Sequence, residues 1–354
     1  MNMPLNREFW RGKRVLITGH TGFKGAWLTR WLASLDSNII GLSLPPTTAP
    51  NLHDMLATPL AGEYILDLSD AEATREAVDS AQPDIVLHLA AQSLVPESYR
   101  DPVGTFRSNF MGTIHLLDAI RSSQARAAIQ AIVVATTDKV YANDETGHAF
   151  NEGDRLGGDD PYSASKAAVE IAVHAWRHSF ATTTPPLGTV RAGNVIGGGD
   201  WAPYRLLPDI VRAARSGKPL DIRRPNATRP WQHVLDPLHG YLLYAQALAS
   251  GNMPPPNLNF APADTRSLAV REIADSLTQA FGIPGWQYVP APETKEKDAL
   301  ALDASLAFKS LGWKPSFSNI AAIATTVEWY KAWAQGDDVK TLTDRQIESF
   351  EETI

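Results

Sequence analysis

Short apolar segments alternate along the first half of the chain with segments in which apolar residues recur at helical spacing. An apolar run without polar alternation is typical of a strand buried on both faces, and helices between such strands cover the two faces of a parallel sheet. The pattern therefore predicts an α/β fold with a doubly wound parallel sheet. The predicted strands are residues 13–18, 38–44, 63–68, 84–90, 129–137 and 187–193.

A glycine-rich turn joins the first predicted strand to the helix predicted over 25–35. Gly19, Gly22 and Gly25 have the spacing G-x-x-G-x-x-G. The first glycine permits a tight turn, the second lets the backbone approach a pyrophosphate, and the third allows close packing of helix on strand. Because the motif stands between a strand and a helix, it predicts a dinucleotide site of Rossmann type. The alternative is a tight turn that binds no ligand.

The end of the second predicted strand lacks the acidic residue that ordinarily binds the adenosine ribose. The strand ends in Ser43 and Leu44, and no arginine follows that could bind a 2′-phosphate. This favours NAD over NADP as the cofactor. Asp67, after the third strand, is predicted either to reach the adenine amino group or to cap the next helix.

Tyr162 and Lys166 are four residues apart at the start of a predicted helix and therefore share one face. An ammonium near a phenol lowers the pKa of the phenol. A phenolate beside a nicotinamide ring is a suitable base for an alcohol proton while hydride leaves. With Thr137 at the end of the fifth strand as a second hydroxyl, the pair is predicted to be catalytic. The alternative is an exposed helical pair without a role.

An acid and a base, Asp138 and Lys139, follow Thr137 directly. They would lie at the carboxyl end of the sheet, where ligands bind in such folds. After oxidation of a sugar at C4, Lys139 could remove the C5 proton and Asp138 could protonate the departing C6 hydroxyl. These roles require a depressed pKa for the amine and a raised pKa for the carboxyl. The alternative is a mutually neutralising ion pair in a solvated turn.

The composition argues against several other classes of protein. A net charge of −7 over 354 residues disfavours nucleic acid or an anionic membrane as the main partner. The absence of cysteine excludes disulfides, thiolate metal sites and a thiol nucleophile. We expect no metal, because no His, Asp or Glu residues have metal-ligand spacing along the sequence. A cytoplasmic enzyme or binding protein is expected, since neither a signal peptide nor a membrane span is visible.

Proline-rich turns divide the chain after about residue 185. We expect an NAD-binding domain over 1–193 and a lobe over 194–354 that mainly binds substrate, with some later strands and helices returning to the first sheet. Helices are predicted near 267–281 and 317–334. The acidic segment after 336 is predicted to be a solvated end.

Six segments spread over residues 15–245 resemble the extended short-chain dehydrogenase/reductase superfamily and, within it, the branch of CDP-glucose 4,6-dehydratases. They are TGHTGFKGAWL, HLAAQSLV, TTDKVYA, DPYSASKAAVE, VRAGNVIGGGDW and RPWQHVLDPLHGYL. The resemblance implies conversion of CDP-D-glucose to CDP-4-dehydro-6-deoxy-D-glucose and water, with tightly bound NAD. It also implies a homodimer or higher homo-oligomer in which helices 104–123 and 161–180 of each subunit pack together.

The resemblance also assigns roles to individual positions. Relatives acting on dTDP-glucose or GDP-mannose place a glutamate where Lys139 stands, which favours the CDP-sugar branch. Asn194 would begin the loop that meets the diphosphate, and Arg205 and Arg229 are the arginines predicted to bind the nucleotide sugar. The catalytic positions are Thr137, Asp138, Lys139, Tyr162 and Lys166, and those of the cofactor are Gly19, Thr21, Gly22, Phe23, Lys24, Gly25, Asp67, Leu68, Ala90, Ala91 and Gln92, together with Tyr162 and Lys166.

Two departures from the branch pattern leave the substrate open. Ser93 follows Gln92, and Pro96 stands where an arginine is expected. The alternatives are therefore a UDP- or dTDP-sugar dehydratase, a 4-epimerase, or a non-catalytic NAD-binding protein. His88 and His233 are expected to be packed histidines without a metal.

Overall fold

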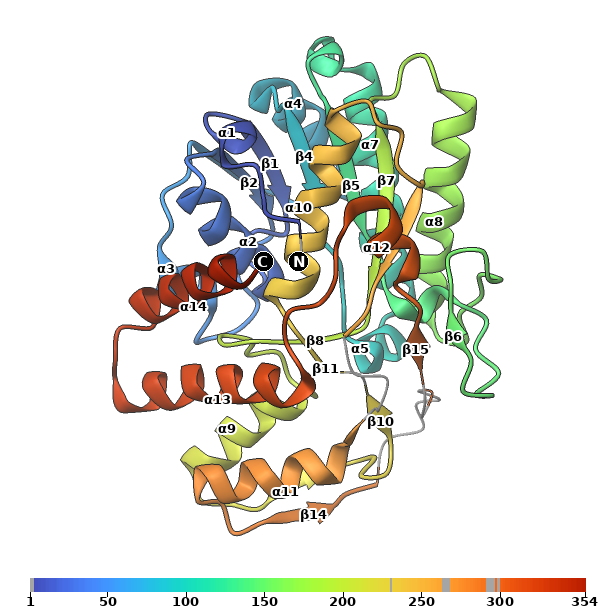
Figure 1. The fold of residues 1–354 in the computed structure, drawn as a ribbon. Helices are drawn as coiled ribbons and strands as arrows, with labels where there is room; N and C mark the ends of the chain where they lie inside the picture. Colours follow the sequence, from blue (N-terminus) through green and yellow to red (C-terminus); the bar gives the residue numbers. More distant parts are fainter. Residues whose placement is uncertain (1–2, 230, 263–267, 291–296, 298–299) are drawn as a thin grey trace.

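The computed structural model describes residues 3–229, 231–262, 268–290, 297 and 300–354. Its centre is a seven-stranded sheet in the order β12-β7-β5-β4-β1-β2-β3, in which every neighbouring pair is parallel (Figure 1). The strand order reverses beside β1, which is where a doubly wound sheet opens a crevice for ligands. The strands are β1 (Arg14–Thr18), β2 (Asn38–Ser43), β3 (Gly62–Ile65), β4 (Ile85–His88), β5 (Ala131–Ala135), β7 (Leu187–Ala192) and β12 (Asn257–Phe260).

The predicted fold class and six predicted strands are confirmed. The interior strands β1, β4, β5 and β7 are buried along almost their whole length, as their apolar sequences require. The seventh strand, β12, comes from the later part of the chain and pairs with β7 at the edge.

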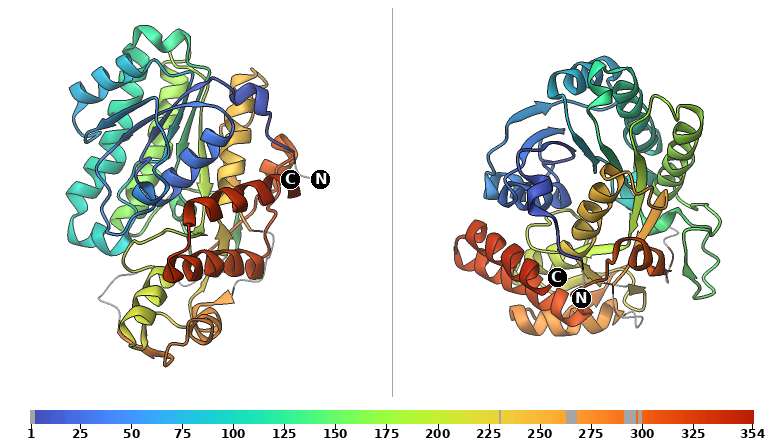
Figure 2. Two further views of the ribbon diagram at one scale, coloured as in Figure 1. Left: turned by 90° about the vertical axis from the view of Figure 1, so that its left-hand side faces the viewer. Right: turned by 45° about the horizontal axis from the view of Figure 1, so that its top comes forward.

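Helices cover both faces of the sheet (Figures 1 and 2). One apolar cluster packs α2 (Phe23–Ser34) and α10 (Leu235–Ala249) on one face, and a second packs α4 (Ala71–Ala81), α7 (Gly112–Ser122) and α8 (Pro161–Ser179) on the other. The two clusters bury both faces of the sheet, so the ends of the strands are the part of the sheet left for a ligand to reach.

The helix predicted over 104–123 is interrupted. It consists of α6 (Pro102–Phe106), a π-helical turn (Arg107–Met111) and α7. Asn109, inside the turn, is buried and accepts a hydrogen bond from Gln92 N at 2.8 Å. π-turns of this kind often lie beside functional sites.

A second lobe lies below the strand ends in Figure 1. It contains α9 (Leu206–Ser216), α11 (Val270–Phe281) and α13 (Asn319–Gln335). Four two-stranded pairs accompany it or link it to the sheet domain: β8 (Asn194–Ile196) with β11 (Trp231–His233), β9 (Leu220–Ile222) with β14 (Trp286–Tyr288), β10 (Thr228–Arg229) with β13 (Leu268–Ala269), and β6 (Ala149–Phe150) with β15 (Ala301–Leu302). Further elements are α1 (Arg7–Trp10), α3 (Leu52–Leu56), α5 (Val95–Arg100), α12 (Ser305–Leu311) and the 3₁₀ turns Gln124–Ala127 and Asp138–Val140.

The prediction of a solvated end after 336 was wrong. Residues Val339–Thr353 form α14, which packs against α2 and α3. Val339, Leu342, Ile347 and Phe350 are all buried and recur at helical spacing. Two of the acidic residues also bind the sheet domain: Asp344 pairs with Arg30 of α2, and Glu351 accepts from Trp31 Nε1 at 2.9 Å. The apolar periodicity of this segment was therefore a better guide than its net charge. Among the described residues, no helix combines the length and the apolar character needed to cross a bilayer.

Candidate active site

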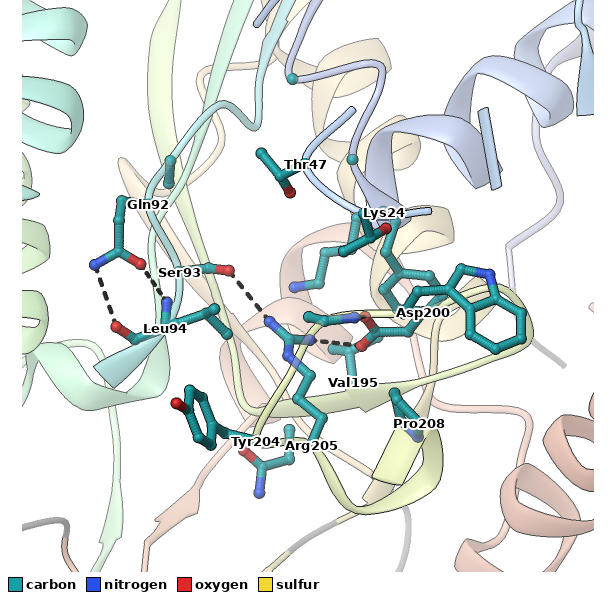
Figure 3. A pocket seen from close by; sticks show the side chains of 18 of the residues that line it. Lys24, Thr47, Gln92, Ser93, Leu94, Val195, Asp200, Tyr204, Arg205 and Pro208 are labelled. Atoms are coloured by element: carbon teal, nitrogen blue, oxygen red, sulfur yellow. Dashed lines mark hydrogen bonds and ion pairs between the residues drawn. The ribbon is translucent and has the colours of Figure 1, made fainter. Parts of the chain in front are cut away.

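A cavity of about 670 Å³ lies at the carboxyl ends of the strands, between the sheet and the second lobe (Figure 3). The glycine-rich turn lines one side, the end of β5 and the start of α8 line the floor, and arginines of the second lobe line the far side. Of the predicted site residues whose side chains the structure describes, all except Asp138 line this cavity.

The glycine-rich turn fits a dinucleotide. Gly19 has φ +76°, and a Cβ there would lie 2.8 Å from the Ala90 backbone; a Cβ at Gly25 would lie 2.0 Å from Gly19 O. The turn can therefore close this tightly only with glycine. Gly22 is the N-cap of α2 and offers no side chain to the first-turn N–H groups. These N–H groups face the cavity as a site for a pyrophosphate.

The adenosine side of the cavity carries hydroxyl groups and one carboxylate. Thr21 Oγ1 lies 2.8 Å from Ser43 Oγ and donates to Leu44 O at 2.9 Å. Asp67 accepts a hydrogen bond from Ser69 N at 2.8 Å, whereas the cap of α4 is Asp70. The helix-capping alternative for Asp67 is therefore wrong, and its carboxylate borders the cavity.

Several cations surround the cavity. Lys24 is a half-buried residue, and burial of its ammonium, together with the charge of Arg205, lowers its pKa to about 8. The charges of Lys166 and Lys139 also lower the pKa of Lys24. Such a concentration of positive charge in a chain of net charge −7 suits the phosphates of a cofactor and a substrate.

Asp138 and Lys139 form a 3₁₀ turn directly after β5, with Thr137 as its N-cap. Thr137 Oγ1 donates to Asp138 Oδ1 at 2.9 Å, and Lys139 Nζ lies 3.3 Å from the same oxygen. The side chains of Lys139 and Asp138 are only 18% and 4% exposed. The two charges are thus an ion pair, but the alternative of a solvated turn is wrong. Lys139 faces the main cavity, while Asp138 faces a small adjoining pocket that Lys139 also lines.

Tyr162 and Lys166 lie on the first turns of α8, whose N-cap Asp160 accepts from Ser163 N at 2.9 Å. Burial raises the pKa of Tyr162, and the charge of Lys139 followed by the hydroxyl of Thr137 lowers it. The cation with the largest effect on the pKa of Tyr162 is thus Lys139, whereas the sequence had suggested Lys166 for this role. Lys166 Nζ instead donates to Ala135 O at 3.0 Å, and burial lowers its own pKa to about 8.

A buried polar network supports this floor and was not predicted. Arg191 donates to both carboxylate oxygens of Glu170, at 2.9 and 2.8 Å, and to Tyr141 Oη at 2.7 Å. Glu170 also accepts from Thr136, and Tyr141 donates to Asn259 Oδ1 at 2.8 Å. The network ties α8, the end of β5 and β12 together. Glu170 follows Lys166 by one helical turn, which is the only sequence signal that could have indicated it.

On the far side, Arg205 spans the cavity (Figure 3). It donates to Asp200 Oδ2 at 2.9 Å within the second lobe and to Ser93 Oγ at 3.2 Å on the sheet side. Tyr204 has φ +65°, an unusual conformation for a tyrosine, and Arg223 lies 4.7 Å above its ring. Sequence reasoning did not single out Asp200 or Tyr204.

The other predicted residues have mixed outcomes. Asn194 lines the cavity, whereas for Arg229 only the backbone, in β10, is described, and its side chain falls outside the described part of the structure. His88 is a packed histidine between Thr18 and Thr113, at 2.6 and 2.8 Å. His233 is also buried, and burial lowers the pKa of each to about 3.

Residues 15–258 match the model of the NAD dependent epimerase/dehydratase family. The chain is 39% identical to a CDP-glucose 4,6-dehydratase of Salmonella typhimurium over 98% of both chains. It is 28% identical to a dTDP-glucose 4,6-dehydratase of Xanthomonas campestris pv. campestris, over 91% of this chain and 95% of that protein. A dTDP-glucose 4,6-dehydratase from Streptomyces venezuelae, solved with NAD bound, has the same fold with a TM-score of 0.78 and 24% identity, covering 91% of this chain and 98% of that one.

Proposed function

The chain belongs to the NAD dependent epimerase/dehydratase family, and we propose that it is a nucleotide-sugar 4,6-dehydratase. The substrate we propose is CDP-D-glucose, and the products are CDP-4-dehydro-6-deoxy-D-glucose and water. The relative with 39% identity is a CDP-glucose enzyme, whereas the dTDP-glucose relatives have 28%. Residues 1–193 would mainly hold the cofactor and residues 194–354 the nucleotide sugar.

Tyr162 and Thr137 would bind the C4 hydroxyl, and Tyr162 would take its proton. The Thr137 hydroxyl and the charge of Lys139 both favour the phenolate form of Tyr162 that this step needs. Lys166, held at Ala135 O, would bind the nicotinamide ribose. The chemistry supplied by bound NAD is the reversible uptake of a hydride, removed from C4 and returned to C6.

Lys139 and Asp138 would carry out the elimination. A C4 ketone makes the C5 hydrogen acidic, Lys139 removes that proton, and Asp138 gives a proton to the departing C6 oxygen. Because Lys139 Nζ and Asp138 Oδ1 are 3.3 Å apart, the ammonium proton can first pass to Asp138, which gives the neutral amine and the carboxylic acid that this step needs. Removal of the C5 proton by Lys139 and donation to the C6 oxygen by Asp138 then restore the ion pair. The proton that Tyr162 took from the C4 hydroxyl balances the one that C5 regains once hydride has reached C6. This buried acid–base pair beside Tyr162 is the observation that carries the proposal.

Arg205, Asn194 and Arg229 would bind the diphosphate. Arg205 reaches across to Ser93 on the sheet side. Ser93 is three residues before Pro96, the position at which the CDP-glucose branch is expected to have an arginine. The guanidinium of Arg205 therefore lies near the segment that lacks this arginine. The planar fork of arginine suits phosphate oxygens.

The test is to incubate the purified protein with CDP-, dTDP- and UDP-glucose and to follow the sugar nucleotides by mass spectrometry. Loss of one water from CDP-glucose, with no net change in NAD, is the expected result. An isomer of unchanged mass would indicate a 4-epimerase, and the absence of turnover with every substrate would indicate a binding protein. Turnover confined to another nucleotide would refute the choice of CDP.

A further inference from the structure

Three side chains with metal-binding atoms meet behind the cofactor cavity. They are His20 of the glycine-rich turn, His53 of α3 and Glu63 of β3, and their ligand atoms all lie within 4.8 Å of one another. None of the three lines the cavity. Because the three residues belong to separate segments, no spacing along the chain indicated this cluster.

The distances between the ligand atoms are within an ångström of those around a metal ion. His20 Nε2 lies 2.8 Å from Glu63 Oε1, and His53 Nε2 lies 3.6 Å from the same oxygen. A tetrahedral zinc with bonds of about 2.0–2.2 Å keeps its ligand atoms roughly 3.3–3.6 Å apart. Small side-chain movements would therefore bring all three groups into coordination.

The backbone fixes two of these ligands in advance. Glu63 pairs in register with Gly41 of β2, so the two residues face the same side of the sheet. A Cβ at Gly41 would lie 2.6 Å from the imidazole of His20. The glycine therefore leaves the space in which the His20 ring lies beside Glu63.

The third ligand is held by the packing of α3. Leu52 and Leu56 are buried on either side of His53 and fix the short helix to the core. The rings of His53 and His20 meet edge to face with centroids 5.2 Å apart. The side chains of His53 and Glu63 are 21% and 39% exposed, so an ion could enter from solvent and keep a water as its fourth ligand.

The chemical types of the three side chains also suit coordination. Two imidazoles and one carboxylate are a donor set that zinc accepts in proteins.

We propose that His20, His53 and Glu63 form a zinc site that fastens α3 and β3 to the glycine-rich turn. Asn51 and Leu52, next to His53, line the cofactor cavity. The ion would therefore steady the wall of the cofactor cavity and take no part in the reaction. The proposal does not depend on which nucleotide sugar the protein uses.

The test uses the full chain without an affinity tag, stripped with a chelator, and measures Zn²⁺ binding by equilibrium dialysis with elemental analysis. One zinc per chain is expected. His53→Gln and Glu63→Gln should each weaken binding by at least about tenfold. Both positions are partly exposed, so these variants should fold, whereas His20 stays unchanged because it belongs to the cofactor turn.

Two control variants address other histidines that could attract zinc. His148→Asn removes the exposed pair of His148 with Asp154, 2.8 Å apart, and His174→Asn separates the His174 and His178 rings on α8, whose centroids are 4.1 Å apart. Both controls should bind zinc as the unmodified protein does. Loss of zinc in a control, with retention in His53→Gln, would overturn the proposal.

Cobalt and thermal unfolding supply independent readouts. Co²⁺ in the proposed site should give the intense visible absorption of tetrahedral coordination, and His53→Gln should lack it. Zinc should raise the Tm of the unmodified protein and not that of His53→Gln, because only a ligand bound to the folded state stabilises it. If neither zinc nor cobalt binds the stripped protein, the cluster is a hydrogen-bonded group only and the proposal fails.

Discussion

Lys139 Nζ lies 3.3 Å from Asp138 Oδ1, with both side chains withdrawn from solvent at the carboxyl end of β5. The same lysine lowers the pKa of the Tyr162 phenol, which burial otherwise raises. Lys139 thus connects two halves of the proposed reaction: its charged form favours the phenolate that takes the C4 proton, and its neutral form removes the C5 proton. The two roles can be separated by mutation.

Tyr162→Phe and Lys139→Ala should stop the reaction at different points. Without the phenol no group takes the C4 proton, so no NADH absorbance should develop with CDP-glucose. Lys139→Ala should still develop NADH absorbance but lose water about 10²- to 10⁴-fold more slowly, as expected for loss of a general base. Stopped-flow absorbance and mass spectrometry of the quenched product measure the two steps. Identical arrest of both variants before NADH forms would contradict this division of roles.

The pH dependence of NADH formation should move in Lys139→Ala. The charge of Lys139 lowers the pKa of Tyr162, so its removal leaves the effect of burial less opposed and the pKa rises. Because the phenolate is the active form, the pH profile of the oxidation step should shift to higher pH. Lys139→Arg, which keeps the charge, should keep the profile near that of the unmodified protein. An unshifted profile in Lys139→Ala would mean that another group governs this step.

The buried pair of Glu170 and Arg191 should contribute strongly to stability. The side chains are 4% and 3% exposed, and Glu170→Gln would leave the guanidinium buried without its counter-charge. Breaking one partner of a buried pair costs about 3–5 kcal/mol in free energy of unfolding, measured by urea denaturation. Glu328→Gln, which breaks the exposed pair with Arg345, should change the same quantity by less than about 1 kcal/mol. Equal effects of the two variants would show that the network does not stabilise the fold.

Much of the fold could be predicted because burial on both faces leaves a direct mark in the sequence. The interior strands are continuous apolar runs. The first turn requires glycine because a Cβ at Gly25 or Gly19 would lie only 2.0 or 2.8 Å from neighbouring backbone atoms. The strand β12, Asn-Leu-Asn-Phe, was missed because two asparagines obscure it, and Asn259 is in fact buried and bonded to Tyr141.

Site residues could be predicted where they belong to one short sequence motif. They were harder to predict where segments far apart in the sequence come together. Thr137, Lys139, Tyr162 and Lys166 were identified from local motifs, and the structure places them around one cavity. A motif does not determine which partner a side chain binds: Arg191 binds Glu170 in the buried network, and Lys166 donates to the backbone carbonyl of Ala135.

The exposed apolar face around α6 and α8 supports a homodimer, which the family resemblance implies and which we propose for this chain. Val103 and Ile171 are 67% and 61% exposed, and Phe106 and Met111 are also exposed on neighbouring turns. Ile171→Glu should convert the dimer to a monomer, measured by light scattering after size-exclusion chromatography, because a charge at the centre of an apolar interface is strongly disfavoured. Ile320→Glu is the matched control: Ile320 is 76% exposed on α13, away from this face, and the variant should remain dimeric. An unmodified protein that is already monomeric, or an Ile171→Glu variant that stays dimeric, would exclude this face as the interface.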